Sequence, residues 1–117
     1  MWKIETTDTF DRWLSSLDDR ERSAMLAALI VLQTKGPLLP RPWADTIKHS
    51  RYHNMKELRV QCGGQPLRAF FAFDPFRTGI ILCAGNKAGN EKRFYEEMIP
   101  LADRELTAYL NNKEGKE

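Results

Sequence analysis

The segment KELRVQCGGQPLRAFFAFDPFR, residues 56–77, limits the possible folds of the chain most strongly. Two runs of alternating apolar and polar residues lie on either side of Gly63 and Gly64. Alternation with a period of two is typical of a half-buried strand, and a glycine pair between two such runs is typical of a tight turn. The segment therefore predicts an antiparallel β-hairpin with its turn at residues 63–66.

The alternation also assigns the two faces of this hairpin. One face collects Leu58, Val60, Cys62, Leu67, Ala69, Phe71 and Phe73. The other face collects Glu57, Arg59, Gln61, Arg68, Phe70 and Ala72. Since successive side chains of a strand point to opposite sides, Arg59 and Arg68 belong to the same face. We expect the apolar face to pack against helices and the arginine face to be exposed.

Further strands extend this hairpin. A turn at residues 74–79 leads into the apolar run IILCAG, which predicts a third strand of a meander. The run WKIET at residues 2–6 places Trp2 and Ile4 on one face and predicts a short first strand.

Two helices are predicted between the first strand and the hairpin. Thr7 or Asp8 can cap the first one, whose apolar stripe is Phe10, Trp13, Leu14 and Leu17. Asp18 and Glu21 have the spacing of a capping box, and Gly36 followed by Pro37 predicts the end of the second helix. Its expected core residues are Met25, Leu26, Leu29, Ile30 and Leu32. The pair reads as an antiparallel helical hairpin.

The segment from Gly36 to Asn54 contains three prolines and predicts a loop, in which Trp43 is expected to pack the chain in place. Near the other end, Asn90 can cap a helix that begins at Glu91, and Pro100 is expected to start a second helical segment. The polar tail at residues 111–117 is expected to fray.

Together these elements predict an α+β fold: an N-terminal strand and helical hairpin packed on a small, mainly antiparallel sheet, with a C-terminal helix. A length of 117 residues predicts a single domain over residues 1–117. No apolar run is long enough to span a membrane and the N-terminus has no apolar signal core, so we expect a cytoplasmic protein without a membrane partner.

The two cysteines, Cys62 and Cys83, are interpreted as reduced strand residues. They could be neighbours on one sheet, which keeps a disulfide or a metal role as a minor alternative. With two histidines and no clustered ligands, the sequence predicts neither a metal site nor a cofactor.

Charge is distributed unevenly along the chain. Residues 41–93 hold ten Lys and Arg against four acids, a charge of +6, whereas residues 1–40 and 94–117 carry −1 and −3. This asymmetry indicates an anionic partner for the middle of the chain, although a solvated sheet face would look the same.

No short catalytic motif accounts for these cations. The segment GNKAGN lacks the Gly-Lys-Ser/Thr ending of a phosphate-binding loop, and no Ser, Cys or carboxylate stands in a nucleophile motif. His49 and His53 are interpreted as surface residues, with His53 kept as a minor acid/base candidate. Arginine clamps phosphate in a bidentate manner, and RNA supplies its own 2′-OH nucleophile. A protein can therefore cleave RNA without a metal if it aligns that hydroxyl and stabilises the charge of the transition state.

The order of elements resembles that of the RelE/ParE toxin superfamily of bacterial toxin–antitoxin systems. More narrowly, KELRV, LRAFFAFDPFR and IILCAGNKAGNEKRFYEEMIPLADRELTAYL resemble the HigB branch, which is related to phage Gp49-like proteins. The resemblance implies a toxin that is a ribosome-dependent mRNA endonuclease, an endoribonuclease that inhibits translation. It also implies a HigA-like helix-turn-helix antitoxin as partner, and contact with operator DNA only through that antitoxin.

The resemblance also implies roles for individual residues. Arg68 matches the strand arginine placed on the scissile phosphate, Lys87 a second cationic position, and Tyr95 an aromatic residue used for base stacking or proton transfer. Lys56 and Arg59 lie on the strand where the group carries basic residues. The remaining cationic candidates for RNA or ribosome contact are Lys48, Arg51, His53, Arg77, Lys92 and Arg93.

The sequence departs from the RelE pattern in its longer proline loop and in lacking a dense lysine cluster on the first hairpin strand. The general base therefore stays unassigned, and the antitoxin is expected on either the helical hairpin or the basic groove. Two other functions stay open: a ParE-like toxin that acts on DNA gyrase, which shares this fold, and a non-enzymatic RNA-binding module.

Overall fold

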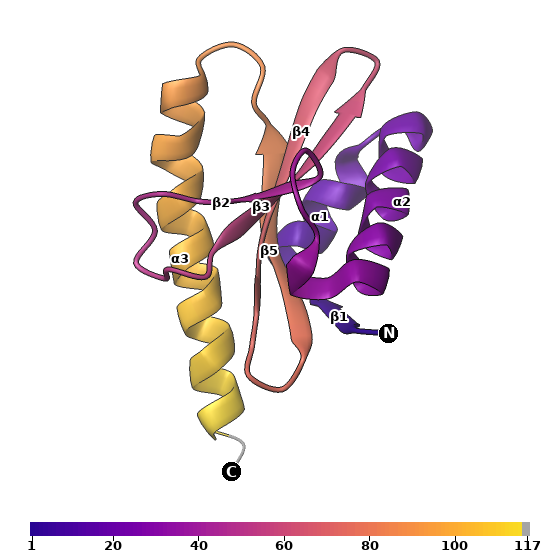
Figure 1. Cartoon of the computed structure of the whole chain (residues 1–117). Helices are drawn as coiled ribbons and strands as arrows, with labels where there is room; N and C mark the ends of the chain where they lie inside the picture. Colours follow the sequence, from indigo (N-terminus) through magenta and orange to yellow (C-terminus); the bar gives the residue numbers. More distant parts are fainter. Residues whose placement is uncertain (116–117) are drawn as a thin grey trace.

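The computed structural model describes residues 1–115, with side chains described through residue 112. A five-stranded sheet lies between a helical hairpin on one side and a single long helix on the other (Figure 1). The elements are β1 (Lys3–Thr6), α1 (Asp8–Ser16), α2 (Asp19–Lys35), the 3₁₀ turn η1 (Gly36–Leu38), β2 (Ala44–Thr46), β3 (Lys56–Cys62), β4 (Gln65–Phe73), β5 (Thr78–Asn86) and α3 (Glu91–Gly115).

The strands lie in the order β1-β5-β4-β3-β2. Only the β1–β5 pair is parallel, and the other three pairs are antiparallel. The predicted α+β architecture with a mainly antiparallel sheet and a C-terminal helix is therefore confirmed. Within the part of the chain that the structure describes, no helix is long and apolar enough to cross a membrane.

The caps of the helical hairpin follow the sequence closely. Thr7, one of the two predicted caps, accepts a hydrogen bond from the Phe10 amide at 3.1 Å and donates one to the Leu82 carbonyl at 2.6 Å, which ties α1 to β5. Asp18 and Glu21 form the predicted capping box. Gly36 ends α2 with a positive φ of 66°, a conformation that favours glycine.

The helical hairpin packs on one face of the sheet around a core that includes Phe10, Met25, Leu32, Leu58 and Phe71. The prediction that Leu26 and Ile30 of α2 also face this core is wrong, since their exposed fractions are 44% and 61%. The buried stripe of α2 follows positions 25, 28, 29 and 32 at helical spacing, and residues 26 and 30 fall off that stripe.

The opposite face of the sheet is not exposed as predicted, because α3 covers much of it. A second core forms there from Phe70, Ala72, Ile80, Leu82, Ala102 and Leu106, among others. A β-bulge contributes to this core. Phe70 pairs with Cys83 and Phe71 with Ile81, so Leu82 is an extra residue and both Leu82 and Cys83 join the same cluster.

Helix α3 is continuous, whereas the sequence predicted a new segment at Pro100 and a frayed tail from residue 111. Pro100 lies on the exposed side of the helix, where water can bind the Glu96 carbonyl that the missing N–H leaves unpaired. Residues 111–115 belong to α3, and residues 116–117 of the expected tail lie outside the described residues.

The proline-rich segment also differs from its prediction, because it contains the short edge strand β2. All three prolines precede Ala44, so none of them removes an N–H from the pairing of β2 with β3. Trp43, predicted to pack this segment in place, is 50% exposed.

After β2 the chain runs along α3 and is fastened to it by side chains. Ser50 and the Arg51 amide donate hydrogen bonds to the Asp103 carboxylate, and the hydroxyls of Tyr52 and Thr107 are hydrogen-bonded. These contacts hold the segment that carries Lys48 and His49 beside the N-terminal half of α3.

The hairpin turn is tighter than the predicted residues 63–66, since β4 already begins at Gln65. Gly63 and Gly64 have φ values of 56° and 79°, which a two-residue turn requires and which glycine adopts without strain. Cys62 pairs with Gln65, and Cys83 lies on β5 opposite Phe70. Both are buried free thiols on strands, but they are not neighbours, so a shared disulfide or metal is ruled out for them.

Candidate active site

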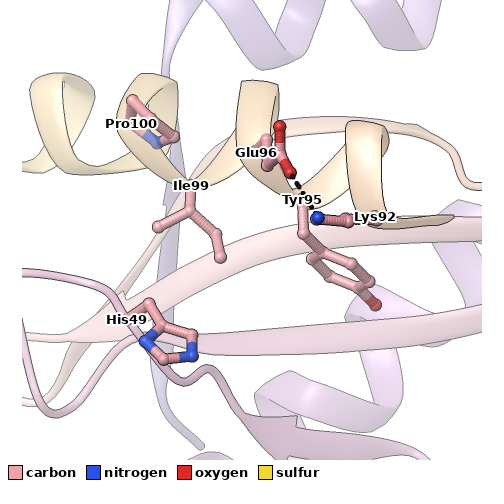
Figure 2. A pocket seen from close by; sticks show the side chains of 6 residues that line it. All are labelled: His49, Lys92, Tyr95, Glu96, Ile99 and Pro100. Carbon is pink, nitrogen blue, oxygen red and sulfur yellow. Dashed lines mark ion pairs between the residues drawn. The ribbon is translucent and has the colours of Figure 1, made fainter.

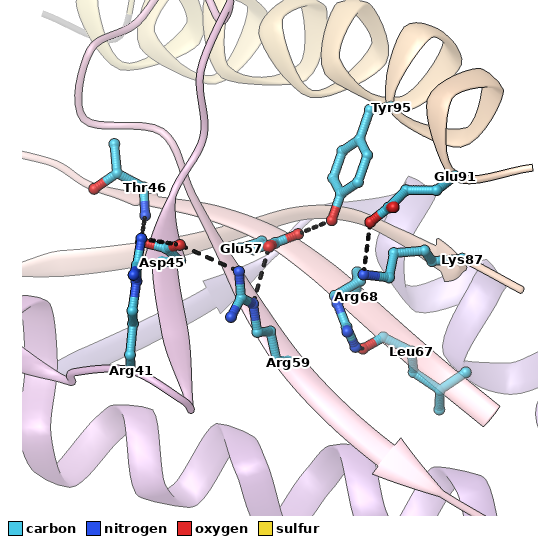
Figure 3. Close-up of polar contacts among 10 residues, drawn as sticks. All are labelled: Arg41, Asp45, Thr46, Glu57, Arg59, Leu67, Arg68, Lys87, Glu91 and Tyr95. Carbon is cyan, nitrogen blue, oxygen red and sulfur yellow. Dashed lines mark hydrogen bonds and ion pairs between the residues drawn. The ribbon is translucent and has the colours of Figure 1, made fainter. Parts of the chain in front are cut away.

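A network of charged and hydroxyl groups forms where the arginine face of β3 and β4 meets the N-terminal turns of α3 (Figure 3). Its centre is Glu57, which is only 4% exposed. One carboxylate oxygen, Oε1, accepts a hydrogen bond from the Tyr95 hydroxyl at 2.6 Å, and Oε2 accepts one from Arg59 Nε at 3.0 Å. Glu57 therefore links α3 to the arginine face of the sheet.

Arg59 continues the network toward the sheet edge. Its Nη2 donates to Asp45 Oδ2 at 3.2 Å, and Arg41 Nη2 lies 3.0 Å from the same oxygen. The hydrogen bond from Arg41 lowers the pKa of Asp45, with further contributions from the Thr46 amide and the charges of Arg41 and Arg59. Asp45 therefore remains ionised and is a weak proton acceptor.

Arg68 differs from Arg59, which it faces directly across the β3–β4 ladder. It is 8% exposed, and its Nη1 donates to the Leu67 carbonyl at 3.0 Å. Its Nε is buried without a hydrogen-bond partner, and no ion pair to Arg68 is found among the described residues. A buried donor without a partner is costly, and an anionic ligand is one group that could satisfy it.

Lys87 approaches the same region from the end of β5. Its amide donates to the Pro66 carbonyl at 2.9 Å, and its Nζ lies 2.9 Å from Glu91 Oε1. The hydrogen bond and the charge of Lys87 lower the pKa of Glu91, and the charges of Arg68 and Arg59 add to this effect. The fields of the three cations therefore converge at the start of α3.

Tyr95 is held in place by aromatic packing. Its ring contacts those of Phe70 and Phe94, with centroids 6.1 Å and 5.2 Å away. Gly85 allows this close approach, because a Cβ there would lie 2.9 Å from Phe94 Cε1. Burial first, and then the Glu57 carboxylate, raise the pKa of Tyr95 well above its ordinary value, although the Arg68 charge opposes them. The phenol therefore keeps its proton at neutral pH.

Two hollows that share three lining residues open beside this network. One, of about 450 Å³, lies between α3 and the segment after β2 that carries His49 (Figure 2). It is lined by His49, Lys92, Tyr95, Glu96, Ile99 and Pro100. The other, of about 380 Å³, shares His49, Tyr95 and Ile99 and reaches Glu57 and Arg59. A ligand in the first hollow would therefore lie next to the carboxylate of the network.

Four of the five residues predicted as catalytic come together here: Arg59, Arg68, Lys87 and Tyr95. Lys56 does not, because alternation turns it to the helical-hairpin face, where its Nζ donates to the Pro37 carbonyl at 2.8 Å.

The residues predicted to contact RNA or the ribosome are divided. Lys48 and Lys92 line the two hollows. Arg51 and His53 are exposed on the segment fastened along α3, and Arg93 forms an ion pair with Glu97 at 3.1 Å. Arg77 is not at the site: it lies in the β4–β5 turn, with its guanidinium 3.9 Å from the Trp2 ring centroid.

Sequence reasoning missed five residues of this site: the acids Asp45, Glu57 and Glu91, the arginine Arg41 that pairs with Asp45, and His49 beside the network. A signal existed for Glu57, which alternation places on the face of Arg59, and for Glu91, four residues after Lys87. The expected basic face is in fact nearly balanced, since four cations meet three carboxylates. Within residues 1–115, no group of three or more potential metal ligands occurs.

The fold is shared with solved toxins. A mutant of E. coli toxin RelE in the free state superposes with a TM-score of 0.57 at 7% identity, over 80% of this chain and 90% of that one. The archaeal RelE–RelB complex from Pyrococcus horikoshii gives 0.55 at 18% identity, over 74% and 96%. The chain thus has the fold of the RelE class of toxins.

Sequence comparisons narrow this class. The model of the phage-derived Gp49-like family matches residues 12–107, and the chain belongs to that family. It is 41% identical over 105 residues to the Mycobacterium tuberculosis protein named "Putative toxin HigB3", covering 90% of each chain. It is 44% identical over 99 residues to "Putative toxin HigB2" of the same organism, of whose length it spans 49%. The predicted resemblance to RelE/HigB-type toxins is confirmed.

Proposed function

We propose that this toxin is a metal-independent, ribosome-dependent mRNA endonuclease that acts in the cytoplasm and inhibits translation. The observation that carries the proposal is the buried, unpartnered Nε of Arg68 beside the hydrogen-bonded pair of Glu57 and Tyr95. A charged donor without a partner suits an oxyanion, and a carboxylate bonded to a phenol suits proton transfer.

In this proposal, Arg68 binds the scissile phosphate and stabilises the charge that develops on its non-bridging oxygens. Arg59 is held beside Arg68 by its hydrogen bonds to Glu57 and Asp45. Lys87 can leave its ion pair with Glu91 and bind the same phosphate instead. Lys87 forms an ion pair with either Glu91 or the phosphate. Because the ion pair with the exposed Glu91 contributes little stability, breaking it costs little.

The chemical step is a transesterification. The 2′-oxygen bonds to the adjacent phosphorus and the bond from phosphorus to the 5′-oxygen breaks, which leaves a 2′,3′-cyclic phosphate and a 5′-hydroxyl. We assign the proton of the 2′-OH to Glu57, because its carboxylate is hydrogen-bonded to both Arg59 and the Tyr95 hydroxyl and so lies between the phosphate-binding arginines and the proton donor.

Tyr95 completes the proton balance. Its hydroxyl donates its proton to the leaving 5′-oxygen and recovers one from Glu57 across the 2.6 Å hydrogen bond. Glu57 then returns to the carboxylate and Tyr95 to the neutral phenol, so the site needs no outside proton. The hollow beside Tyr95 gives the nucleotide next to the cut a place against Ile99 and His49.

We also propose a protein partner, encoded by an adjacent gene. This partner is a HigA-like helix-turn-helix antitoxin that neutralises the toxin and carries it to operator DNA. The fold neighbour solved as a RelE–RelB complex supports an antitoxin in general. Co-expression with the adjacent gene and affinity capture tests it. If cells that express the chain alone grow normally and the chain captures no protein from the adjacent gene, this assignment is contradicted.

The cellular test of the nuclease is induced expression without the antitoxin, followed by primer extension on translated messages. We expect translation to stop and new 5′ ends to occur inside coding regions, with no cuts when Arg68 is changed to Ala. Intact messages together with gyrase-dependent DNA damage would assign the protein to the ParE-like alternative. Intact messages with tight RNA binding would indicate the non-enzymatic module.

A further inference from the structure

We propose that Trp43 is a stacking platform for the nucleobase next to the phosphate held by Arg59 and Arg68. This inference rests on the proposed nuclease function, because it names a position on the same RNA strand. Trp43 is 50% exposed. Tryptophan residues are highly buried on average, so this exposure leaves the ring free to contact a ligand.

The backbone around Trp43 is fixed to the site. Its carbonyl accepts a hydrogen bond from the Arg59 amide at 2.8 Å, and its amide donates to the Pro40 carbonyl at 3.0 Å. The backbone of Trp43 therefore has a defined place at the edge of the sheet beside Arg59, and its side chain lines the hollows there. A platform that is already in position loses little conformational freedom when a base stacks on it.

Trp43 borders two hollows that share Arg59 and Gln61. The first, of about 400 Å³, is lined by Pro42, Trp43, Arg59, Gln61 and Arg68. The second, of about 300 Å³, is lined by Trp43, Arg59, Val60, Gln61 and four small or β-branched residues of α2: Ala24, Ala27, Ala28 and Val31. Trp43 thus borders both hollows, and the first of them reaches Arg68, whose Nε has no hydrogen-bond partner.

The chemistry of this depression suits a nucleotide. Indole and guanidinium planes stack on the flat faces of bases, arginine binds the phosphate, and the exposed Gln61 amide can both donate to and accept from a base edge. An acidic amphipathic helix would be the other possible occupant. We favour RNA because two arginines and an amide converge with a single aromatic ring, whereas a helix requires a row of apolar pockets.

The order of the site residues along β3 suggests a path for the RNA strand. Glu57 contacts Tyr95, Arg59 follows two residues later, and Gln61 lies two residues further beside Trp43. Trp43 and the hollow at Tyr95 therefore lie on opposite sides of the arginines. An RNA strand crossing the site would place one base on Trp43, the scissile phosphate on Arg68 and the next base at Tyr95.

The test is single-turnover cleavage of a synthetic message on programmed ribosomes, with messages in which one nucleotide near the cut lacks its base. We expect Trp43→Ala to reduce the cleavage efficiency roughly tenfold to a hundredfold, the range for loss of one base stack. Trp43→Phe should retain most of the efficiency. Phe76→Ala, which removes an even more exposed aromatic ring in the β4–β5 turn, should retain all of it.

Base removal locates the stacked nucleotide. At one position beside the cut, the abasic message should lower the parent rate as much as Trp43→Ala does, and the two changes together should have no further effect. Independent, multiplying effects at every position within two nucleotides of the cut would overturn the platform, as would Trp43→Ala cleaving at the parent rate.

The remaining outcomes separate this inference from the proposed function. Parent-rate cleavage by Trp43→Ala with loss of antitoxin capture would assign the depression to the protein partner and leave the nuclease intact. A parent chain that cleaves no message would overturn the nuclease and the platform together. Circular dichroism of each variant confirms that the fold is retained.

Discussion

Arg59 and Arg68 face each other across the β3–β4 ladder, yet only Arg59 is hydrogen-bonded to carboxylates. Two like charges directly opposite on neighbouring strands destabilise a sheet. Glu57 and Asp45 neutralise the first arginine and leave the second available. We therefore expect the fold to carry a cost at Arg68 that a bound anion would relieve.

Replacing Arg68 by Met should consequently raise the free energy of unfolding while removing activity. The change keeps the buried stem but removes an incompletely paired charge, whose burial typically costs about 1–3 kcal/mol. Urea unfolding monitored by circular dichroism measures the effect. Arg59→Met is the matched control and should destabilise, because it leaves Glu57 and Asp45 without their shared donor. Equal destabilisation by both variants would show that Arg68 is structurally satisfied.

Glu57→Gln should lower single-turnover cleavage by about 10²–10⁴-fold, the usual contribution of a positioned general base. The amide keeps the size of the side chain, and its oxygen can accept from Arg59 while its NH2 group donates to the Tyr95 hydroxyl, so the fold should persist. Glu97→Gln, on the exposed side of α3, is the control and should cleave at the parent rate. If both glutamate variants cleave alike, the proton acceptor is another group.

The phenol of Tyr95 should ionise well above the ordinary range of a tyrosine. Absorbance at 295 nm during alkaline titration reports this ionisation, and Tyr95→Phe should remove a late component of the curve. Because Glu57 contributes to the raised pKa after burial, Glu57→Gln should move that component toward lower pH. Burial also raises the pKa of Tyr109, to about 12, so Tyr95→Phe is needed to separate the two.

The same shift predicts how stability depends on pH. A folded-state pKa above the ordinary value near 10 means that the folded protein holds the phenolic proton more tightly than the unfolded chain. The stabilisation is complete below pH 10 and decreases as the pH rises above it. Parent and Tyr95→Phe should therefore differ more in urea unfolding at pH 8 than at pH 11. An unchanged difference would contradict the assigned shift.

The fold was largely predictable because its signals are local. Alternation in Lys56–Cys62, the Gly63–Gly64 pair and the capping box at Asp18 each depend on a few adjacent residues. The packing of α3 on the arginine face was not predictable in this way. It depends on contacts of Ala102 and Leu106 with β5, which lies about twenty residues earlier in the sequence. The site shows the same division: Arg59 and Arg68 were paired by alternation, whereas their link to Tyr95 passes through Glu57, an acid that a search for cations overlooks.

Glu91→Gln should strengthen RNA binding. The change removes the ion pair that holds Lys87, at 2.9 Å, and frees this lysine for a phosphate. One added phosphate contact should steepen the dependence of log affinity on log salt by about 0.7, the value for single strands. Filter binding of a non-cleavable RNA, methylated at the scissile 2′-oxygen, measures it from low to moderate salt. Glu97→Gln, which frees Arg93 outside the site, should leave the slope unchanged.

The central claim is that Arg68 stabilises the transition state of RNA cleavage. Single-turnover cleavage of ribosome-bound message by purified parent, Arg68→Ala and Arg77→Ala tests it most directly, with circular dichroism and antitoxin capture as checks of folding. Loss of one contact to a developing charge costs about 3–4 kcal/mol, so Arg68→Ala should cleave roughly 10²–10³ times more slowly at saturating toxin. Arg77→Ala, in the β4–β5 turn away from the site, should cleave at close to the parent rate. Cleavage by Arg68→Ala near the parent rate would contradict the account and would leave the arginines as a docking surface.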